Sequence, residues 1–313
     1  MSYFLNRTLS ILLTLLLISM ITFAVTNILP GDVAMMIMGT QSNPEALAGL
    51  RQSLGLNDPI YIQYAHWIGG MLTGNWGNSL IFKVPIATLL LQKATASAII
   101  VVMSMTIALA LAVPLGVWSA VHRDKWQDTV SSSAALFGVS LPDFFWGIML
   151  ILLFARTLGW FPSSGFSDPG EDFSQSIYHA FLPALALGLG LMAHLTRMTR
   201  STMVGILGQE FIRVSRAKGL SERTVVWRYA LSNAIGPVAT IAGLQIGYLF
   251  GSIIVVETLF SYTGMGWLTY QALLNRDVPL IQASVFVIAA VVMLTNFLVD
   301  LFYLLVDPRV RLG

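Results

Sequence analysis

The chain has 313 residues, of which 56% are apolar and 10% charged, and it contains no cysteine. Soluble domains carry about 25% charged residues, so this composition excludes an ordinary soluble protein. Without cysteine there are no disulfides and no thiolate metal sites. A net charge of +2 predicts no general affinity for nucleic acid. Several apolar runs approach the roughly 20 residues needed to cross a bilayer, which predicts an all-α, polytopic membrane protein.

Six segments are apolar and long enough to be membrane spans. We expect them at 8–29, 94–120, 130–158, 180–195, 237–256 and 280–306. The first span follows Arg7 and is too long, and lacks the small-residue cleavage site, for a cleaved signal peptide, so we interpret it as a retained anchor. Lys and Arg favour the cytoplasmic side. Placing both termini in the cytoplasm leaves twelve of the seventeen basic residues inside, and the opposite orientation reverses that count.

The spans predict three domains along the chain. These are an anchor helix with a long external loop (1–93), a five-helix core (94–306) and a short cytoplasmic tail (307–313). In the external loop, Asn43-Pro44-Glu45 is typical of a helix start, and interleaved aromatic residues favour a small folded cap. Between 260 and 279 we expect a turn and a short re-entrant helix.

The longest polar interruption, 197–236, carries seven basic residues against two acidic ones. Gly219 followed by Leu220 and Ser221 predicts one short helix that ends and a second that begins, on the cytoplasmic face. Leu207, Phe211 and Val214 would form a narrow apolar stripe on the first helix. The pattern alone leaves two functions open, contact with lipid headgroups and docking of a protein. Arg200, near the end of the bundle, is expected to contribute little to docking.

Two features inside the spans concern helix packing and polarity. Gly243, Gly247 and Gly251 recur every four residues, which predicts one face where a neighbouring helix approaches closely. Pro142 interrupts the third span, and Ser140 and Asp143 flank the break. They either line a water-filled translocation path, or Asp143 caps the second half of a split helix.

Motifs of catalysis or nucleotide binding are not convincing. His122-Arg123-Asp124 resembles part of a kinase catalytic loop but has no Gly-rich phosphate loop beside it. The glycines at 188 and 190 lie within an apolar span with no preceding strand, so they are not a dinucleotide fingerprint. No GxxxxGK[ST] occurs, and the four histidines form no ligand pattern. We therefore expect no catalytic residue, no metal site and no cofactor.

A family resemblance decides between the alternatives for the basic segment. The run from Glu210 to Leu220, closing on Arg216-Ala217-Lys218-Gly219-Leu220, resembles the EAA loop of the peptide/nickel group of ABC importer permeases, of the dipeptide-permease B type. The other motifs that support the resemblance span nearly the whole chain. They include Leu29-Pro30-Gly31-Asp32, Leu54-Gly55-Leu56, Val113-Pro114-Leu115-Gly116, Gly138-Val139-Ser140-Leu141-Pro142, Arg276-Asp277-Val278-Pro279 and Asp307-Pro308-Arg309.

The resemblance implies a type I permease fold with six transmembrane helices in a bacterial cytoplasmic (inner) membrane. It also implies a second homologous permease, two cytoplasmic ABC ATPases and an external solute-binding protein. The residues expected to dock an ATPase, in a coupling loop within 197–236, are Glu210, Phe211, Arg213, Val214, Arg216, Ala217, Lys218, Gly219 and Leu220.

The sequence departs from the family pattern at two places. Arg213-Val214-Ser215 stands where a general EAA loop has Glu-Ala-Ala, and Tyr262-Thr263-Gly264 replaces an external Trp-Pro-Gly. The solute stays open between di- or oligopeptides and nickel or a metal chelate. A proton- or sodium-coupled transporter that uses Asp143, Glu257 or Asp300 is the competitor from another class, and a membrane-embedded hydrolase is disfavoured by the sparse histidines.

Overall fold

The computed structural model describes residues 2–28, 33–38, 43–53 and 55–306. The fold of these residues is helical, and their β pairing is limited to an isolated bridge between Asn78 and Pro85. Among them, five helices are long and apolar enough to cross a membrane, and a sixth span results if one bent pair counts as one. The predicted all-α, polytopic class is confirmed. The predicted tail 307–313, the 29–32 motif and Leu54 lie outside the described residues.

The chain divides into two compact units, which we describe separately. The first contains residues 1–95 and 264–293, and the second contains 96–263 and 294–313. The expected boundary at residue 93 lies close to the one at 95. The rest of the division differs from the expected five-helix core, because residues 264–293 group with the N-terminal unit.

The first unit is made of the outer connections and parts of three spans. Its elements are α1 (Ser2–Ile28), α2 (Val33–Met38), α3 (Pro44–Ser53), α4 (Ile60–Thr73), the start of α5 (Ile86–Val121), α12 (Met265–Leu274) and most of α13 (Val278–Val306). The expected helix after Asn43 is confirmed as α3. A helix is also present within 260–279, as α12, and its re-entrant course stays a prediction. Tyr64 and Trp67 of α4 pack on Phe23 of α1 with ring centroids 5.4 and 5.7 Å apart, so aromatic contacts fold part of the long loop onto the anchor.

A buried carboxylate organises the same unit. Asp277 is fully buried and precedes α13. Its side chain accepts hydrogen bonds from the Ser79 hydroxyl at 2.5 Å and from the Leu80 N–H at 2.9 Å. It also accepts one from Leu280 N–H at 3.3 Å, as an N-cap does. One aspartate therefore ties the loop before α5 to the start of α13.

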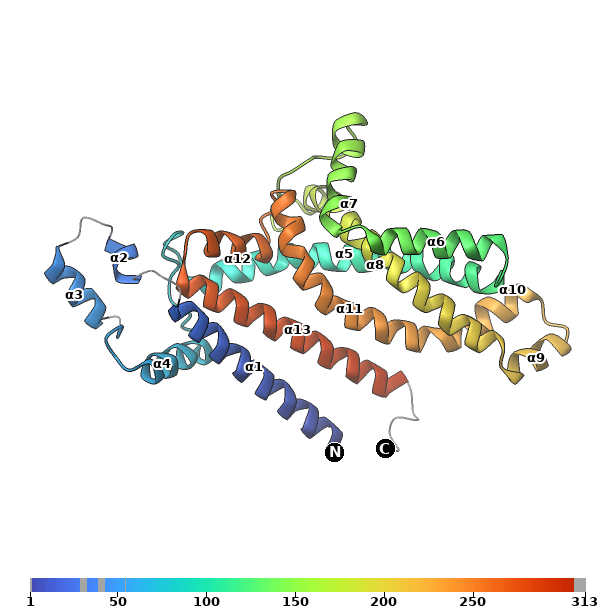
Figure 1. The fold of residues 1–313 in the computed structure, drawn as a ribbon, viewed down its shortest axis with the longest axis horizontal. Coiled ribbons are helices and arrows are strands. Elements are labelled where there is room, and N and C mark those ends of the chain that lie inside the picture. Colours follow the sequence, from blue (N-terminus) through green and yellow to red (C-terminus); the bar gives the residue numbers. More distant parts are fainter. Residues whose placement is uncertain (1, 29–32, 39–42, 54, 307–313) are drawn as a thin grey trace. The chain divides into compact units, whose positions relative to one another are not determined.

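The second unit is a helix bundle around α8 (Figure 1). Its further elements are α6 (Trp126–Ser140), α7 (Asp143–Leu150), the π-helical turn η1 (Ile151–Thr157), α8 (Phe173–Leu207), α9 (Glu210–Ala217), α10 (Glu222–Thr224), the π-helical turn η2 (Val225–Ala230) and α11 (Leu231–Leu259). Leu187, Leu191 and Leu195 of α8 are at most 1% exposed, and α6, α7 and α11 pack on this helix. The core of the unit therefore runs along α8.

The third predicted span is split at its proline. Leu141 has an extended backbone (φ −99°, ψ 131°), as expected for a residue before proline, and α6 ends there. The two halves, 126–140 and 143–157, meet at a bend of 99°, which is visible where α7 turns away from α6 in Figure 1. The break therefore interrupts the helix near the middle of this span.

The helix of the fourth predicted span, α8, is much longer than the apolar part of its sequence. Asp172 caps α8 by accepting a hydrogen bond from Gln175 N–H at 3.0 Å, and the helix continues to Leu207. At 1.5 Å per residue its 35 residues reach about 52 Å, beyond the roughly 30 Å of a hydrocarbon core. The segment 197–236 is therefore not one loop: its first eleven residues extend α8, and its last six begin α11.

Candidate functional site

The short helix α9 lies at one end of the second unit, between the ends of α8 and α11 (Figure 1). α8 ends before Gly208, and α9 begins at Glu210 and runs for eight residues. Gly219 then takes a left-handed conformation with φ +78°. The Ser221 side chain accepts a hydrogen bond from Thr224 N–H at 3.4 Å and caps α10. The expected helix–turn–helix is present.

One face of α9 is anchored in the bundle. Ile212 is fully buried, and Ser215, one turn further along, is 7% exposed. Ile212 joins an apolar cluster that we call the anchoring cluster. Its buried members are Val117, Ala120, Met203, Ile206, Ile212, Val225, Val226, Ala230 and Ala234. Apart from Ile212, these residues come from α5, α8, η2 and α11, so the anchoring cluster packs α9 against four elements.

The face of α9 next to this buried one is apolar and open. Phe211 is 37% exposed and Val214 is 46% exposed. The expected stripe with Leu207 is corrected: Leu207 ends α8 and packs on the anchoring cluster, so it does not share a face with Phe211. On the following helical turn, Val225, Val226 and Ala230 are buried, whereas Tyr229 is 37% exposed. The open surface is therefore Phe211 and Val214 of α9.

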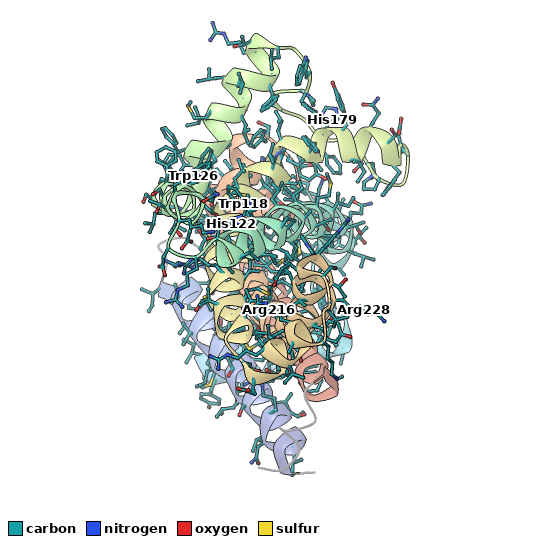
Figure 2. The ribbon with its side chains drawn as sticks, turned by 90° about the vertical axis from the view of Figure 1, so that its right-hand side faces the viewer. Trp118, His122, Trp126, His179, Arg216 and Arg228 are labelled. Atoms are coloured by element: carbon teal, nitrogen blue, oxygen red, sulfur yellow. The ribbon has the colours of Figure 1, made fainter. Side chains whose placement is uncertain are left out.

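Charged side chains surround this apolar pair. Arg216 Nε donates to Glu222 Oε1 at 2.8 Å, which ties α9 to α10. Arg213 and Glu210 are 3.9 Å apart with both side chains largely exposed. Ala217, Lys218 and Gly219 are exposed, and Leu220 is half-buried. Arg228 is exposed and points outward from the second unit (Figure 2). An apolar centre with a polar rim is typical of a protein-binding surface.

Large aromatic side chains lie near the same end. Trp118 of α5, Trp126 of α6 and Trp227 of η2 are 39%, 67% and 47% exposed. The Trp118 and His122 rings are 5.7 Å apart, and both are labelled in Figure 2. Tryptophan concentrates at the interface between membrane and water. The aromatic residues therefore indicate that α9 lies just beyond a membrane surface.

A partly buried ion pair holds α8 where it approaches this surface. Arg200 Nε and Nη2 donate to Asp128 Oδ1 and Oδ2, each at 2.5 Å. Ser119 also donates to Asp128, at 2.6 Å, and the Asp128 side chain is 7% exposed. The pair gives Arg200 a structural role inside the bundle, while the expectation that it contributes little to docking stays a prediction. No local sequence pattern indicates the Asp128–Arg200 pair, because its two members are 72 residues apart.

Asp143 and Ser140 lie on opposite sides of the break in the third span. Asp143 is the first residue of α7 and makes no capping hydrogen bond with its side chain. Its Oδ2 accepts a hydrogen bond from the Tyr248 hydroxyl of α11 at 3.0 Å. Ser140 is exposed and donates to Leu136 C=O at 2.8 Å within its own helix. The hydrogen bonds therefore do not support the alternative in which Asp143 caps the second half of the split helix.

The three glycines of α11 lie in different surroundings. A Cβ on Gly243 would overlap the side chain of Val299 of α13. Gly247 is half-buried, and Gly251 is exposed with no atom within 4 Å of an added Cβ. Close helix approach within this chain therefore occurs at Gly243.

The buried acid of α11 is paired. Glu257 is fully buried, and its Oε1 accepts a hydrogen bond from the Ser97 hydroxyl at 2.5 Å. In the described part of the chain, no three His, Asp or Glu side chains gather as a metal site would require.

Comparisons with known proteins define the class. Residues 112–312 match the binding-protein-dependent transport system inner membrane component family, and residues 1–112 match the N-terminal part of such membrane components. The chain belongs to this family and is an inner-membrane permease subunit of the ABC importer type. It is 35% identical to the glutathione transport system permease protein GsiC of Escherichia coli (strain K12), over 99% of each chain.

Other relatives support the same class. The chain is 35% identical, over 99% of each chain, to the dipeptide transport system permease protein DppB of Alkalihalophilus pseudofirmus. It is also similar to a chain of the MetNI methionine ABC transporter in an inward-facing conformation, with a TM-score of 0.60 and 18% identity. That match covers 70% of this chain and 96% of the other. At this identity it shows the fold alone, and it agrees with the expected permease fold.

Proposed function

We propose that the chain is the permease subunit of an ATP-driven importer for di- or oligopeptides. Two relatives that match over almost their entire length are named as glutathione and dipeptide permeases, and both solutes are short peptides. The chain would pair with a second, homologous permease and form half of the translocation path. An external binding protein would deliver the solute, and two cytoplasmic ATPases would supply the energy.

The observation that carries the coupling role is the two-sided helix α9. Its Ile212 side is buried in the anchoring cluster, while Phe211 and Val214 remain open at the end of the bundle. The sequence has no P-loop pattern, so a conformational change driven by ATP must reach this chain through a surface contact. A groove on an ATPase that binds Phe211 would bias the bundle between two arrangements.

The orientation is part of the proposal. Both termini and α9 lie in the cytoplasm, which places most Lys and Arg on that side. The chain lacks cysteine, so single-cysteine variants report sidedness without background. Ser221→Cys in the turn after α9 should react with a thiol reagent only after the membrane is opened. Ser163→Cys, which is exposed after η1, should react in sealed cells. The opposite labelling pattern would reject this orientation.

Uptake in reconstituted vesicles tests the function. The chain, its partner permease and the two ATPases are placed in liposomes, and labelled dipeptide is added with the binding protein. We expect uptake to require ATP on the side of the membrane where the ATPases are bound. It should persist when ionophores abolish the ion gradients. Uptake that needs a proton or sodium gradient but no ATP would identify a secondary transporter. Uptake of labelled nickel in place of dipeptide would move the solute class to metals.

A further inference from the structure

A polar cavity lies in the second unit, away from α9. It measures about 190 Å³ and is lined from α6–α7, α8 and α11. Its polar side chains are Asp143 at the start of α7, His194 of α8, and Gln245 and Tyr248 of α11. Three helices therefore direct polar groups to one place in the bundle.

The cavity lies at the middle of the spans. Gly190 is the central residue of α8 and Gln245 that of α11, and both line the cavity. The break after Leu141 is at the centre of the bent pair 126–157. The cavity therefore lies within the membrane-spanning elements, where polar side chains are expensive unless they face water or each other.

These side chains are not sealed inside the bundle. Tyr248 is 53% exposed, and Asp143, His194 and Gln245 are half-exposed. Lipid tails cannot satisfy such groups, so the surface that carries them must face an aqueous path. Gly190 contributes by its small size, because a Cβ there would overlap the Asp143 carboxylate.

The hydrogen-bonding capacity of the cavity is complementary to one end of a peptide. Within the described residues, the Asp143 carboxylate accepts one hydrogen bond, from Tyr248, and has capacity for more. His194 Nδ1 lies 3.2 Å from Arg197 Nη2. A guanidinium can only donate, so Nδ1 accepts and the neutral ring carries its proton on Nε2. Gln245 supplies both an acceptor and a donor.

We infer that this cavity is a transient binding site for the N-terminal end of a peptide during its passage. The Asp143 carboxylate receives the α-ammonium group, and Tyr248 holds that carboxylate in place. Gln245 and His194 N–H groups donate to the first peptide carbonyl. A bare metal ion fits less well, because the described residues offer no cluster of three His, Asp or Glu ligands. The inference rests on the proposed import of peptides and assigns a subsite within that path.

The test compares transport with ATP consumption in the reconstituted importer. Asp143→Asn keeps the shape of the side chain and removes its charge. We expect peptide uptake per ATP hydrolysed to fall about tenfold, with subunit assembly and binding-protein-stimulated ATP hydrolysis unchanged. Tyr248→Phe should reduce the same ratio two- to fivefold. Asp124→Asn, on an exposed turn, and Tyr178→Phe, whose hydroxyl donates to Trp160 C=O at 2.8 Å, are the matched controls and should leave it at the wild-type value.

Other outcomes overturn the inference in distinguishable ways. Uptake by Asp143→Asn equal to the wild type would remove the ammonium site and leave the proposed function intact. Loss of assembly or of stimulated ATP hydrolysis in both Asp143→Asn and Tyr248→Phe would show that the pair is structural. If the wild-type importer itself moves no peptide, the proposed function has failed, and the subsite falls with it.

Discussion

Gly219 allows the chain to reverse direction after α9, because its φ of +78° is a conformation that side chains disfavour. An added Cβ would meet no atom within 4 Å, so the cost of Gly219→Ala is backbone strain alone, about 1–2 kcal/mol. We expect chemical denaturation of the purified complex to show that loss, together with weaker coupling of uptake to ATP hydrolysis.

The control for this substitution is Gly205→Ala. Gly205 is inside α8, where an added Cβ also meets nothing within 4 Å, and alanine favours a helix by about 1 kcal/mol. Its stability should stay the same or rise. Equal behaviour of the two variants would show that the backbone after α9 relaxes freely.

Arg200 is the second residue whose role can be measured. Arg200→Gln leaves the Asp128 carboxylate, which is 7% exposed, without its bidentate partner. Removing one partner of a fully buried pair costs about 3–5 kcal/mol, and because Arg200 is 29% exposed we expect a smaller loss, about 1–3 kcal/mol. We therefore expect a clearly lower thermal stability in detergent, and partial recovery when Asp128→Asn is added.

Arg213→Gln is the matched control, because Arg213 is 72% exposed and 3.9 Å from Glu210. Exposed pairs contribute about 0–1 kcal/mol. If Arg200→Gln and Arg213→Gln are equally stable, the Asp128 pair does not hold α6 to α8.

At the scale of helices, the close approach of α11 to α13 depends on Gly243. A leucine there would collide with Val299. Overpacking costs about 1–3 kcal/mol, so Gly243→Leu should destabilise the isolated subunit. Gly251→Leu should not, because Gly251 is exposed with free space beside it. Thermal unfolding of the two variants in detergent checks this, and the opposite order would contradict the packing.

Hydropathy predicts much of the helical framework. The six expected spans each coincide with a helix or a helix pair, because backbone in lipid must satisfy its own hydrogen bonds. The break at Pro142 follows from local sterics and is equally visible in the sequence. These features depend on short stretches of chain, so short stretches predict them.

The sequence-based prediction of helix ends is wrong where polar residues are interpreted as a loop. Arg197 and Arg200 mark the water-exposed end of α8 and not the start of a loop. The expected apolar stripe is wrong at Leu207, because Gly208 separates α8 from α9 and Leu207 packs on the anchoring cluster instead of lying beside Phe211. The pairs Asp128–Arg200 and Asp143–Tyr248 join distant segments, which no local pattern can reveal.

At the scale of the molecule, α9 has one role in the proposed function. There it would receive motion from an ATPase on the Phe211 side and pass it to the bundle through Ile212, which is buried in the anchoring cluster. If the basic segment bound only lipid, its affinity would depend on charge, about 1 kcal/mol per Lys or Arg, and not on one apolar side chain. A groove contact instead depends on a central anchor, whose loss often costs about 2 kcal/mol or more.

The direct test measures ATPase binding and solute-stimulated ATP hydrolysis for Phe211→Ala in reconstituted membranes. We predict that the affinity for the ATPases falls about thirtyfold, which corresponds to about 2 kcal/mol, while the permease stays as stable as the wild type. Arg213→Gln should change the affinity less than about fivefold. Ile212→Ala should instead lower the stability of the permease. Wild-type ATPase affinity and stimulated hydrolysis in Phe211→Ala would contradict the account and return the segment to the lipid surface.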